Sequence, residues 1–287
     1  MCLIAFAIGA SPRWPLVIAS NRDEFLERPT LPLARWHTDL GHEIISGRDM
    51  RAGGTWLGVT PGGRVAFLTN VREASPQPAP FSRGQLVMRW LDAGNDVARF
   101  AKALEKDNGA YGGFNLVVGD MQQNNWAWMS NKSSTSSSGW HIQSLQPGIY
   151  GLSNAALDTP WPKTTELKRV LTNALAETHD APDLNALQKP LWNALANRIR
   201  APIEKLPATG APLAIEEALS SAFVDFPEHQ YGTRCSTLLL ATRTEDVGET
   251  TQSLQIQVEE RTHFQPRIDE LATPSTSVMK LFVLNIE

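Results

Sequence analysis

Short apolar runs bounded by Gly, Pro and Ser open the chain. Residues 3–9 (LIAFAIG) and 16–20 (LVIAS) are two such runs, and a proline-containing turn separates them. Runs of this length with these borders are typical of buried strands, so the pattern predicts an N-terminal hairpin. The polar cluster at 21–24 (NRDE) is then expected at the exit of the second strand.

Two more strands are predicted around the Pro-Gly-Gly turn that follows, at 55–60 and 64–69, with Asn70 at the end of the second. The apolar spacing then becomes helical. Amphipathic helices are predicted within 82–94, with Ser82 as N-cap, and within 95–109, with Asn95 or Asp96 as N-cap. Further helices are expected at 158–177, 183–198 and 213–222.

Strand patterns also return between and after these helices, at 112–120, 124–130, 141–145, 148–154, 234–243, 254–264 and 278–284. Runs of consecutive strands favour antiparallel sheets with helices packed outside them, which is an α+β architecture. No repeat and no long linker interrupts the 287 residues, so we expect one domain over 1–287. No Gly-rich phosphate loop follows a strand.

The charge and hydropathy of the sequence exclude some classes of binding partner. The formal net charge is −4 and no Lys/Arg stripe occurs, so the sequence has no electrostatic footprint for nucleic acid. No stretch reaches the ~18 apolar residues of a membrane span, and the apolar N-terminus lacks the basic flank of a signal peptide. The nine Trp residues fit a hydrophobic core better than a ligand cleft.

Only two cysteines occur, Cys2 and Cys235, which is neither a disulfide framework nor a zinc pattern. A Cys2–Cys235 disulfide is conceivable from the sequence, but nothing in it supports one. We therefore expect a reducing, cytoplasmic location. The six histidines show no ligand spacing or haem attachment motif, so no metal and no resident cofactor are expected.

Cys2 has an unusual position directly behind the initiator methionine. Removal of Met1 would leave a thiol and a free α-amine on one residue, with reference pKa values of about 8.5 and about 8. The amine can then act as general base for the thiol, which attacks a carbonyl carbon and forms a thioester. A small buried cysteine at a strand start is the simpler interpretation, so other residues must decide.

Polar clusters at strand ends supply such residues. Asn70 and Asn154 each end a predicted strand, and Asn side chains can stabilise an oxyanion, although Asn also favours turns. Adjacent strand residues point to opposite faces, so only one of Arg22 and Asp23 is expected to point at Cys2. Arg22 would lower the thiol pKa, whereas Asp23 could orient the α-ammonium. Both stay candidates.

The chain is identified as a member of the NRDE family, also called the Transport and Golgi organisation 2 family, by long motifs in order. These are MCLI at 1–4, NRDEF.ERPT at 21–30, GRD...GGTWLG at 47–58, LTN.R at 68–72, SRG.LV at 82–87, NLVVGD at 115–120, GLSN..LDTPWPK at 151–163 and YGTR.ST at 231–237. The family resembles N-terminal-nucleophile hydrolases, which implies a four-layer αββα sandwich of two antiparallel sheets covered by helices.

A more distant resemblance is to the choloylglycine hydrolase and penicillin V acylase group. By motif order it implies catalytic roles for Cys2, Arg22, Asp23, Asn70, Asn154 and Arg234. The expected function is hydrolysis of a linear amide C–N bond in an unknown small substrate. The alternative, which the same family suggests, is a non-catalytic protein that binds or traffics haem or another hydrophobic ligand.

Overall fold

The computed structural model describes residues 2–94, 96–133, 136, 138–179, 183–245, 252–264 and 279–286. The chain divides into two compact units, each built from separate stretches of sequence. Unit 1 contains residues 1–28, 147–152 and 158–287, and unit 2 contains residues 29–146 and 153–157. The expectation of one domain over 1–287 stays a prediction.

Unit 1 is built on a seven-stranded antiparallel sheet, which we call sheet A. Its strand order is β10 (Gly148–Leu152), β1 (Cys2–Ile8), β2 (Leu16–Phe25), β12 (Tyr231–Glu245), β13 (Gln252–Thr262) and β14 (Met279–Ile286), with β11 (Asp225–Phe226) paired to β12. The predicted N-terminal hairpin is confirmed as β1 and β2. Since β2 pairs on both sides, its backbone groups are hydrogen-bonded in the sheet.

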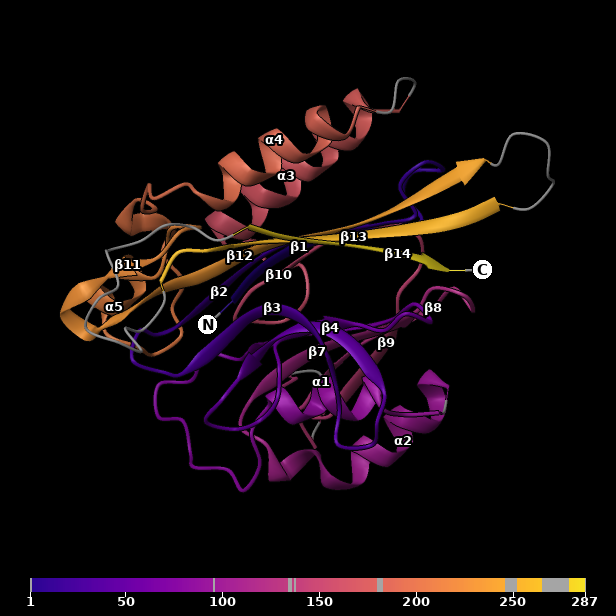
Figure 1. The fold of residues 1–287 in the computed structure, drawn as a ribbon. Helices are drawn as coiled ribbons and strands as arrows, with labels where there is room; N and C mark the ends of the chain where they lie inside the picture. Colours follow the sequence, from indigo (N-terminus) through magenta and orange to yellow (C-terminus); the bar gives the residue numbers. More distant parts are fainter. Residues whose placement is uncertain are drawn as a thin grey trace, which may run out of the picture. The chain divides into compact units, whose positions relative to one another are not determined.

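Helices α3 (Pro162–Glu177) and α4 (Leu184–Leu195) cover one face of sheet A (Figure 1). Alternate strand residues such as Leu3, Ala5 and Leu238 pack there against Leu167 and Leu191. The short helix α5 (Leu213–Ala218) and the 3₁₀ turns η2 (Ile203–Lys205) and η3 (Pro227–His229) complete the unit. This helix-covered face is called the helix face below, and the opposite one the Cys2 face.

Unit 2 contains the second seven-stranded antiparallel sheet, sheet B, whose strands follow one another in sequence order. They are β3 (Thr30–His37), β4 (Glu43–Asp49), β5 (Leu57–Val59), β6 (Arg64–Asn70), β7 (Phe114–Asp120), β8 (Asn125–Ser130) and β9 (His141–Ser144). Strands β3 and β4 carry no strong sequence signal and were not expected.

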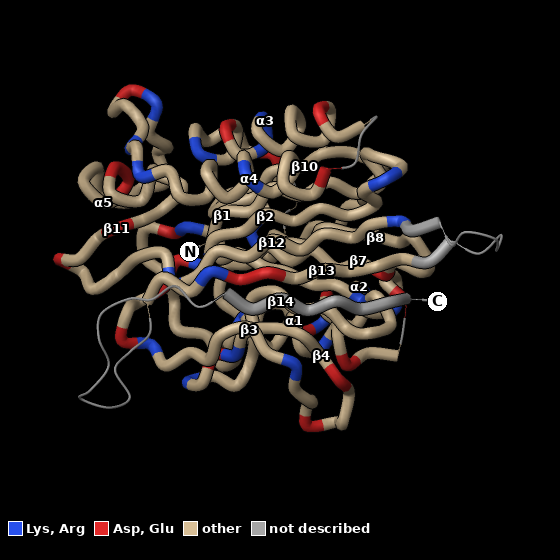
Figure 2. Tube along the Cα trace, turned by 45° about the horizontal axis from the view of Figure 1, so that its top comes forward, with Lys and Arg blue, Asp and Glu red and all other residues tan. Residues whose placement is uncertain are grey.

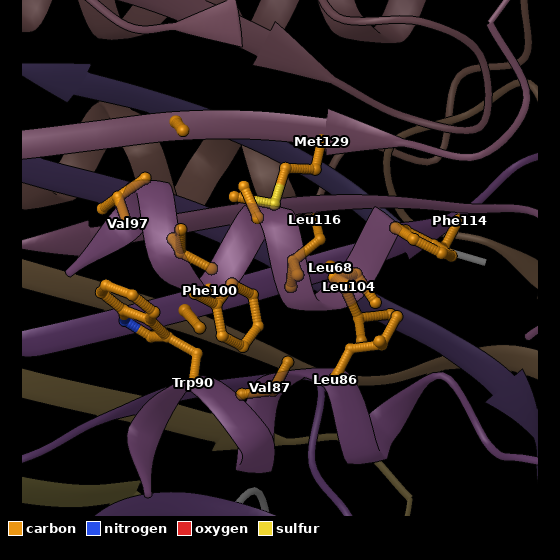
Figure 3. Packing of buried hydrophobic residues seen from close by; sticks show 14 of the residues in the cluster. Leu68, Leu86, Val87, Trp90, Val97, Phe100, Leu104, Phe114, Leu116 and Met129 are labelled. Atoms are coloured by element: carbon orange, nitrogen blue, oxygen red, sulfur yellow. The ribbon is translucent and has the colours of Figure 1, made fainter. Parts of the chain in front are cut away.

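Helices α1 (Gly84–Leu91) and α2 (Val97–Asp107), followed by the 3₁₀ turn η1 (Asn108–Ala110), pack on sheet B. Figure 3 shows Trp90 and Phe100 of these helices facing Leu116 and Met129 of the strands. Asp96 is confirmed as the N-cap of α2, because its side chain accepts the N–H of Arg99. The predicted cap Ser82 lies one residue before the N-cap position, which Arg83 occupies without a side-chain cap bond, although the Ser82 hydroxyl accepts the Gly84 N–H at 3.4 Å.

Several predicted boundaries need correction. Strand β2 continues through the NRDE cluster to Phe25, because β1 and then β12 pair with that stretch. Strand β10 ends at Leu152, two residues before Asn154. Of the nine Trp, all lie in described residues, and all except Trp36 are buried, as a core role requires.

Lys and Arg are interspersed with Asp and Glu along the trace (Figure 2). None of the helices that the structure describes is long and apolar enough to cross a membrane.

Candidate active site

Cys2 is the first residue of β1, and its register places it in a polar row across sheet A. It pairs with Arg22, and Arg22 pairs on its other side with Cys235. Cys235 in turn pairs with Thr262 of β13. Directly paired residues of antiparallel strands point to one face, so these four side chains lie together on the Cys2 face. All four are buried, and we call them the Cys2 row.

The polar character of this face continues for one more row. Thr237 pairs with Glu260, and the Thr237 hydroxyl donates to the Glu260 carboxylate at 3.4 Å. One row further, the face is apolar, with Ile18 paired to Leu239 and Leu239 to Val258. The thiol of Cys2 thus lies at the polar end of a sheet face that is otherwise hydrophobic.

Burial raises the pKa of the Cys2 thiol above its ordinary value, and the Asp23 carboxylate adds to this. The positive charges of the amino terminus and of Arg22, with a hydrogen bond from the Asp23 backbone, act in the opposite direction. Arg22 is itself held 3.9 Å from the Glu24 carboxylate. The net result is a thiol that is protonated at neutral pH and needs a base before it can attack.

Cys235 is the second thiol of the row. Burial and the nearby Glu260 carboxylate raise its pKa well above the ordinary value. Strand β2 separates it from Cys2, and adjacent strands lie about 4.8 Å apart, so the two Cα atoms are about 10 Å apart. A disulfide needs Cα atoms closer than about 7 Å. Neither cysteine forms a disulfide, so the Cys2–Cys235 bond that the sequence allowed is not present.

Asp23 follows Arg22 and turns to the helix face. Its Oδ1 accepts the Thr233 hydroxyl at 2.6 Å, and its backbone carbonyl accepts the Tyr231 hydroxyl at 2.9 Å. Burial, followed by the charges of Asp23 and Glu24, raises the pKa of Tyr231 well above its ordinary value. Of the two alternatives left by the sequence, Arg22 is the residue whose side chain shares the face of Cys2.

Arg234 is the extra residue of a β-bulge in β12, since the register steps from the Thr233–Asp23 pair to the Cys235–Arg22 pair. Its Nη1 donates to three carbonyl oxygens of the turn after β2, those of Phe25, Leu26 and Arg28, each at 2.9 Å. The guanidinium therefore fixes the end of the NRDE strand.

Asn70 and Asn154 contact each other within unit 2. Asn154 Nδ2 donates to both the backbone oxygen and Oδ1 of Asn70, at 3.0 Å each. The backbone is joined as well, because the N–H of Arg72 donates to the Asn154 carbonyl at 2.8 Å. Asn70 Nδ2 makes one long bond, 3.3 Å to the carbonyl of Val71. Asn70 is thus the partner whose amide has a hydrogen to offer.

Five residues of the Cys2 row or of the strands around it were not among the predicted site residues: Glu24, Tyr231, Thr233, Cys235 and Glu260. The first four lie inside the NRDE and YGTRCST motifs, so the motifs marked the right segments without showing on which face of the sheet each side chain lies. Glu260 lies outside these motifs, in a strand whose pairing the sequence does not reveal. Within the described residues, no group of three or more His, Cys, Asp or Glu is arranged to hold a metal ion.

A conjugated bile acid hydrolase of Clostridium perfringens, solved as its C2A mutant, matches this fold at a TM-score of 0.50 and 8% identity. The match covers 98% of this chain and 96% of that one. The fold is therefore the α+β fold of N-terminal-nucleophile hydrolases, with two antiparallel sheets and their helices, as expected from the resemblance.

The family model for Transport and Golgi organisation 2 matches residues 1–255. The bovine Transport and Golgi organization protein 2 homolog is 32% identical over 253 residues, which are 84% of this chain and 88% of that protein. The human homolog is 29% identical over 283 residues, covering 96% of this chain and the whole of that protein. The chain belongs to the Transport and Golgi organisation 2 family.

Proposed function

We propose that the chain is a hydrolase that cleaves a linear amide C–N bond with Cys2 as nucleophile after removal of Met1. The observation that carries this proposal is the Cys2 row, in which the second residue of the chain lies beside Arg22 on a buried polar sheet end. The structural likeness to a conjugated bile acid hydrolase, solved as its C2A mutant, supports a fold that can carry such a reaction.

The raised pKa of the Cys2 thiol makes a base necessary. His263 follows Thr262 of the Cys2 row in sequence. Its imidazole is hydrogen-bonded to Ser236 on the helix face, so it does not act as the base for the Cys2 thiol. The α-amine that Met1 removal exposes on Cys2 has a suitable pKa of about 8. It takes the thiol proton as sulfur bonds to the carbonyl carbon, and it returns that proton to the leaving amine. Water then hydrolyses the thioester to the acid and restores the thiol.

The developing oxyanion needs a hydrogen-bond donor. In the acylase group that the sequence resembles, two Asn side chains occupy the positions of Asn70 and Asn154 in motif order. Because the amide of Asn154 is committed to Asn70, we assign the donor role to Asn70 and an orienting role to Asn154. Arg22 stabilises the thiolate, and Arg234 holds the strand that carries Arg22.

The first test is the intact mass of the purified protein, which should lack one methionine residue. The protein is then assayed on a panel of linear N-acyl amides with chromogenic amine leaving groups. Cys2→Ala keeps a small second residue, so Met1 is still removed and the change isolates the thiol. We expect it to lower kcat by at least about 10³-fold. Undiminished hydrolysis by folded Cys2→Ala, or quantitative retention of Met1 in an active protein, would refute the mechanism.

Asn70→Ala should lower kcat by about 10²- to 10³-fold with a small change in KM, because an oxyanion donor acts in the transition state. Asn154→Ala should cost less, since the Asn70 amide is still present and only its orientation is lost. Equal losses in the two variants would contradict the division of roles.

The alternative of a haem or hydrophobic-ligand carrier gains no support from the nine Trp residues, because eight of them are buried. The family resemblance remains its support. A haem titration of the same preparation, followed by its absorption band, serves as the counter-test. Saturable binding that survives Cys2→Ala, together with no amide hydrolysis, would favour the carrier over the hydrolase.

A further inference from the structure

A continuous hydrogen-bonded chain of side chains lies on the helix face of sheet A, directly behind the Cys2 row. Asn21 pairs with Ser236 across β2 and β12, one residue from Arg22 and Cys235. The Ser236 hydroxyl lies 2.6 Å from Asn21 Oδ1 and 2.8 Å from His263 Nε2. Asn21 and Ser236 are almost fully buried, so these bonds are shielded from water.

The chemistry of the groups fixes the direction of every bond in this chain. Asn21 Nδ2 donates its two hydrogens to the carbonyls of Leu195 and Ala222, each at 2.8 Å. Asn21 Oδ1 can only accept, so the single hydroxyl hydrogen of Ser236 goes to it. Ser236 Oγ must then accept from His263, which carries its hydrogen on Nε2. Because the hydroxyl hydrogen is committed to Asn21, Ser236 is not an activated nucleophile.

The hydrogen-bonded side chains join four segments of unit 1 to β2, the strand that carries the NRDE cluster. These segments are the end of α4, the loop after α5, strand β12 and the residue after β13. Leu195 is the last residue of α4, and Ala222 lies in the loop that follows α5. The backbone N–H of His263 donates to the Arg234 carbonyl at 2.8 Å, so the same residue also grips the bulge of β12. Arg234 in turn clamps the turn after β2. Asn21 and Arg234 thus hold β2 on either side of Arg22 and Asp23.

We propose that His263, Ser236 and Asn21 act as positioning residues that hold Arg22 and the backbone of Asp23 in place beside Cys2. The consequence for catalysis rests on the proposed hydrolase function. The effect on the Cys2 thiol itself does not, because thiol reactivity can be measured without a substrate.

The surroundings of His263 keep its imidazole neutral. Burial lowers its pKa to about 4, and the charges of Arg198 and Arg261 act in the same direction. Each of these arginines stacks on an aromatic ring of the unit, Arg198 on Phe223 and Arg261 on Trp192. The ring of Phe223 also lies edge-on to His263 at 4.9 Å. The imidazole is therefore a fixed neutral donor at physiological pH.

The experiment measures the rate of Cys2 alkylation by iodoacetamide as a function of pH, with the label located on the N-terminal peptide by mass spectrometry. Ser236→Ala and His263→Leu interrupt the hydrogen-bonded chain of side chains, while His263→Gln retains an N–H donor. The Arg22 charge and the Asp23 backbone bond both lower the Cys2 pKa. Displacing them should raise the alkylation midpoint by about 0.5–1 pH unit and slow the reaction at pH 7.5 about 3- to 10-fold.

Ser11→Ala is the matched control, because Ser11 is a buried serine whose hydroxyl accepts the Trp14 N–H in the turn between β1 and β2. It should leave the alkylation midpoint unchanged, and His263→Gln should restore the wild-type profile. If Ser236→Ala fails to fold, His263→Leu decides the question. Unchanged Cys2 profiles in folded His263→Leu, or an equal shift in Ser11→Ala, would overturn the positioning role. Absence of amide hydrolysis in the wild type would remove the catalytic consequence and leave the alkylation result standing.

Discussion

The two faces of sheet A differ sharply at the end where Cys2 lies, although alternate residues of the same strands build them. On the Cys2 face, the Arg22–Glu24 ion pair measures 3.9 Å and the bond from the Thr237 hydroxyl to the Glu260 carboxylate measures 3.4 Å. On the helix face, Asn21 makes three bonds of 2.6–2.8 Å. One face carries the thiols and the charged groups of the site, and the other fixes the strand that carries Arg22.

This difference is the arrangement expected when a reactive group needs a rigid support. A nucleophile that must move a proton and form a bond cannot have all its hydrogen bonds saturated. The residues behind it can, and their saturation determines where it lies. The helix face should therefore control stability, and the Cys2 face should control reactivity.

The sharpest test of that contrast exchanges one residue on each face. Asn21→Ala removes three buried hydrogen bonds and leaves the Leu195 and Ala222 carbonyls without this donor. We expect it to lower the free energy of unfolding by about 3 kcal/mol. Cys2→Ala should lower that free energy by about 1 kcal/mol or less while abolishing amide hydrolysis. Urea unfolding of both variants checks this, and a larger stability loss for Cys2→Ala would contradict the contrast.

A second prediction concerns pH and the helix face alone. The folded state lowers the pKa of His263 to about 4, whereas an unfolded histidine has a pKa of about 6.5. Between these values the unfolded chain binds more protons, so this contribution to stability is complete above pH 6.5 and is lost as the pH falls towards 4. Since His263 is partly exposed, we expect about 1–2 kcal/mol rather than the full value of the shift.

The His263→Gln variant isolates this contribution. The difference in unfolding free energy between wild type and variant, measured in urea from pH 8 to pH 4, should be constant above pH 6.5 and change below it. A difference that is flat over the whole range would show that His263 is not held neutral by its surroundings.

The smallest expected effect is on the Cys2 face. Glu24→Gln removes the carboxylate 3.9 Å from Arg22 and 3.7 Å from Arg28. Ion pairs of such length are weak, so the free energy of unfolding should change by about 0.5 kcal/mol. Thermal unfolding at low and high salt checks this. A loss of unfolding free energy as large as that of Asn21→Ala would mean that the Cys2 face also contributes strongly to the stability of the fold.

Much of the fold could be predicted from the sequence. The hairpin of β1 and β2 follows from two apolar runs around prolines, and the helices α1 to α4 follow from their apolar period. Strands β3 and β4 could not, because β3 (TLPLARWH) contains Pro32 and buries only Leu33, and β4 (EIISGRD) has just two apolar residues in a row. The exact end of β2 also escaped prediction, since its continuation through NRDE depends on pairing with a strand about 210 residues away.

The candidate site, like the fold, could be predicted from the sequence only in part. The sequence by itself determined the family, the segments that carry the site, and the position of Cys2 behind Met1. Tertiary structure decided that Arg22 rather than Asp23 shares the face of Cys2, that the bulge at Arg234 sets its guanidinium on the turn after β2, and that Asn154 turns its amide to Asn70. The physical reason is that a strand residue has two possible faces, and only long-range pairing, with its register and bulges, selects which neighbours it meets.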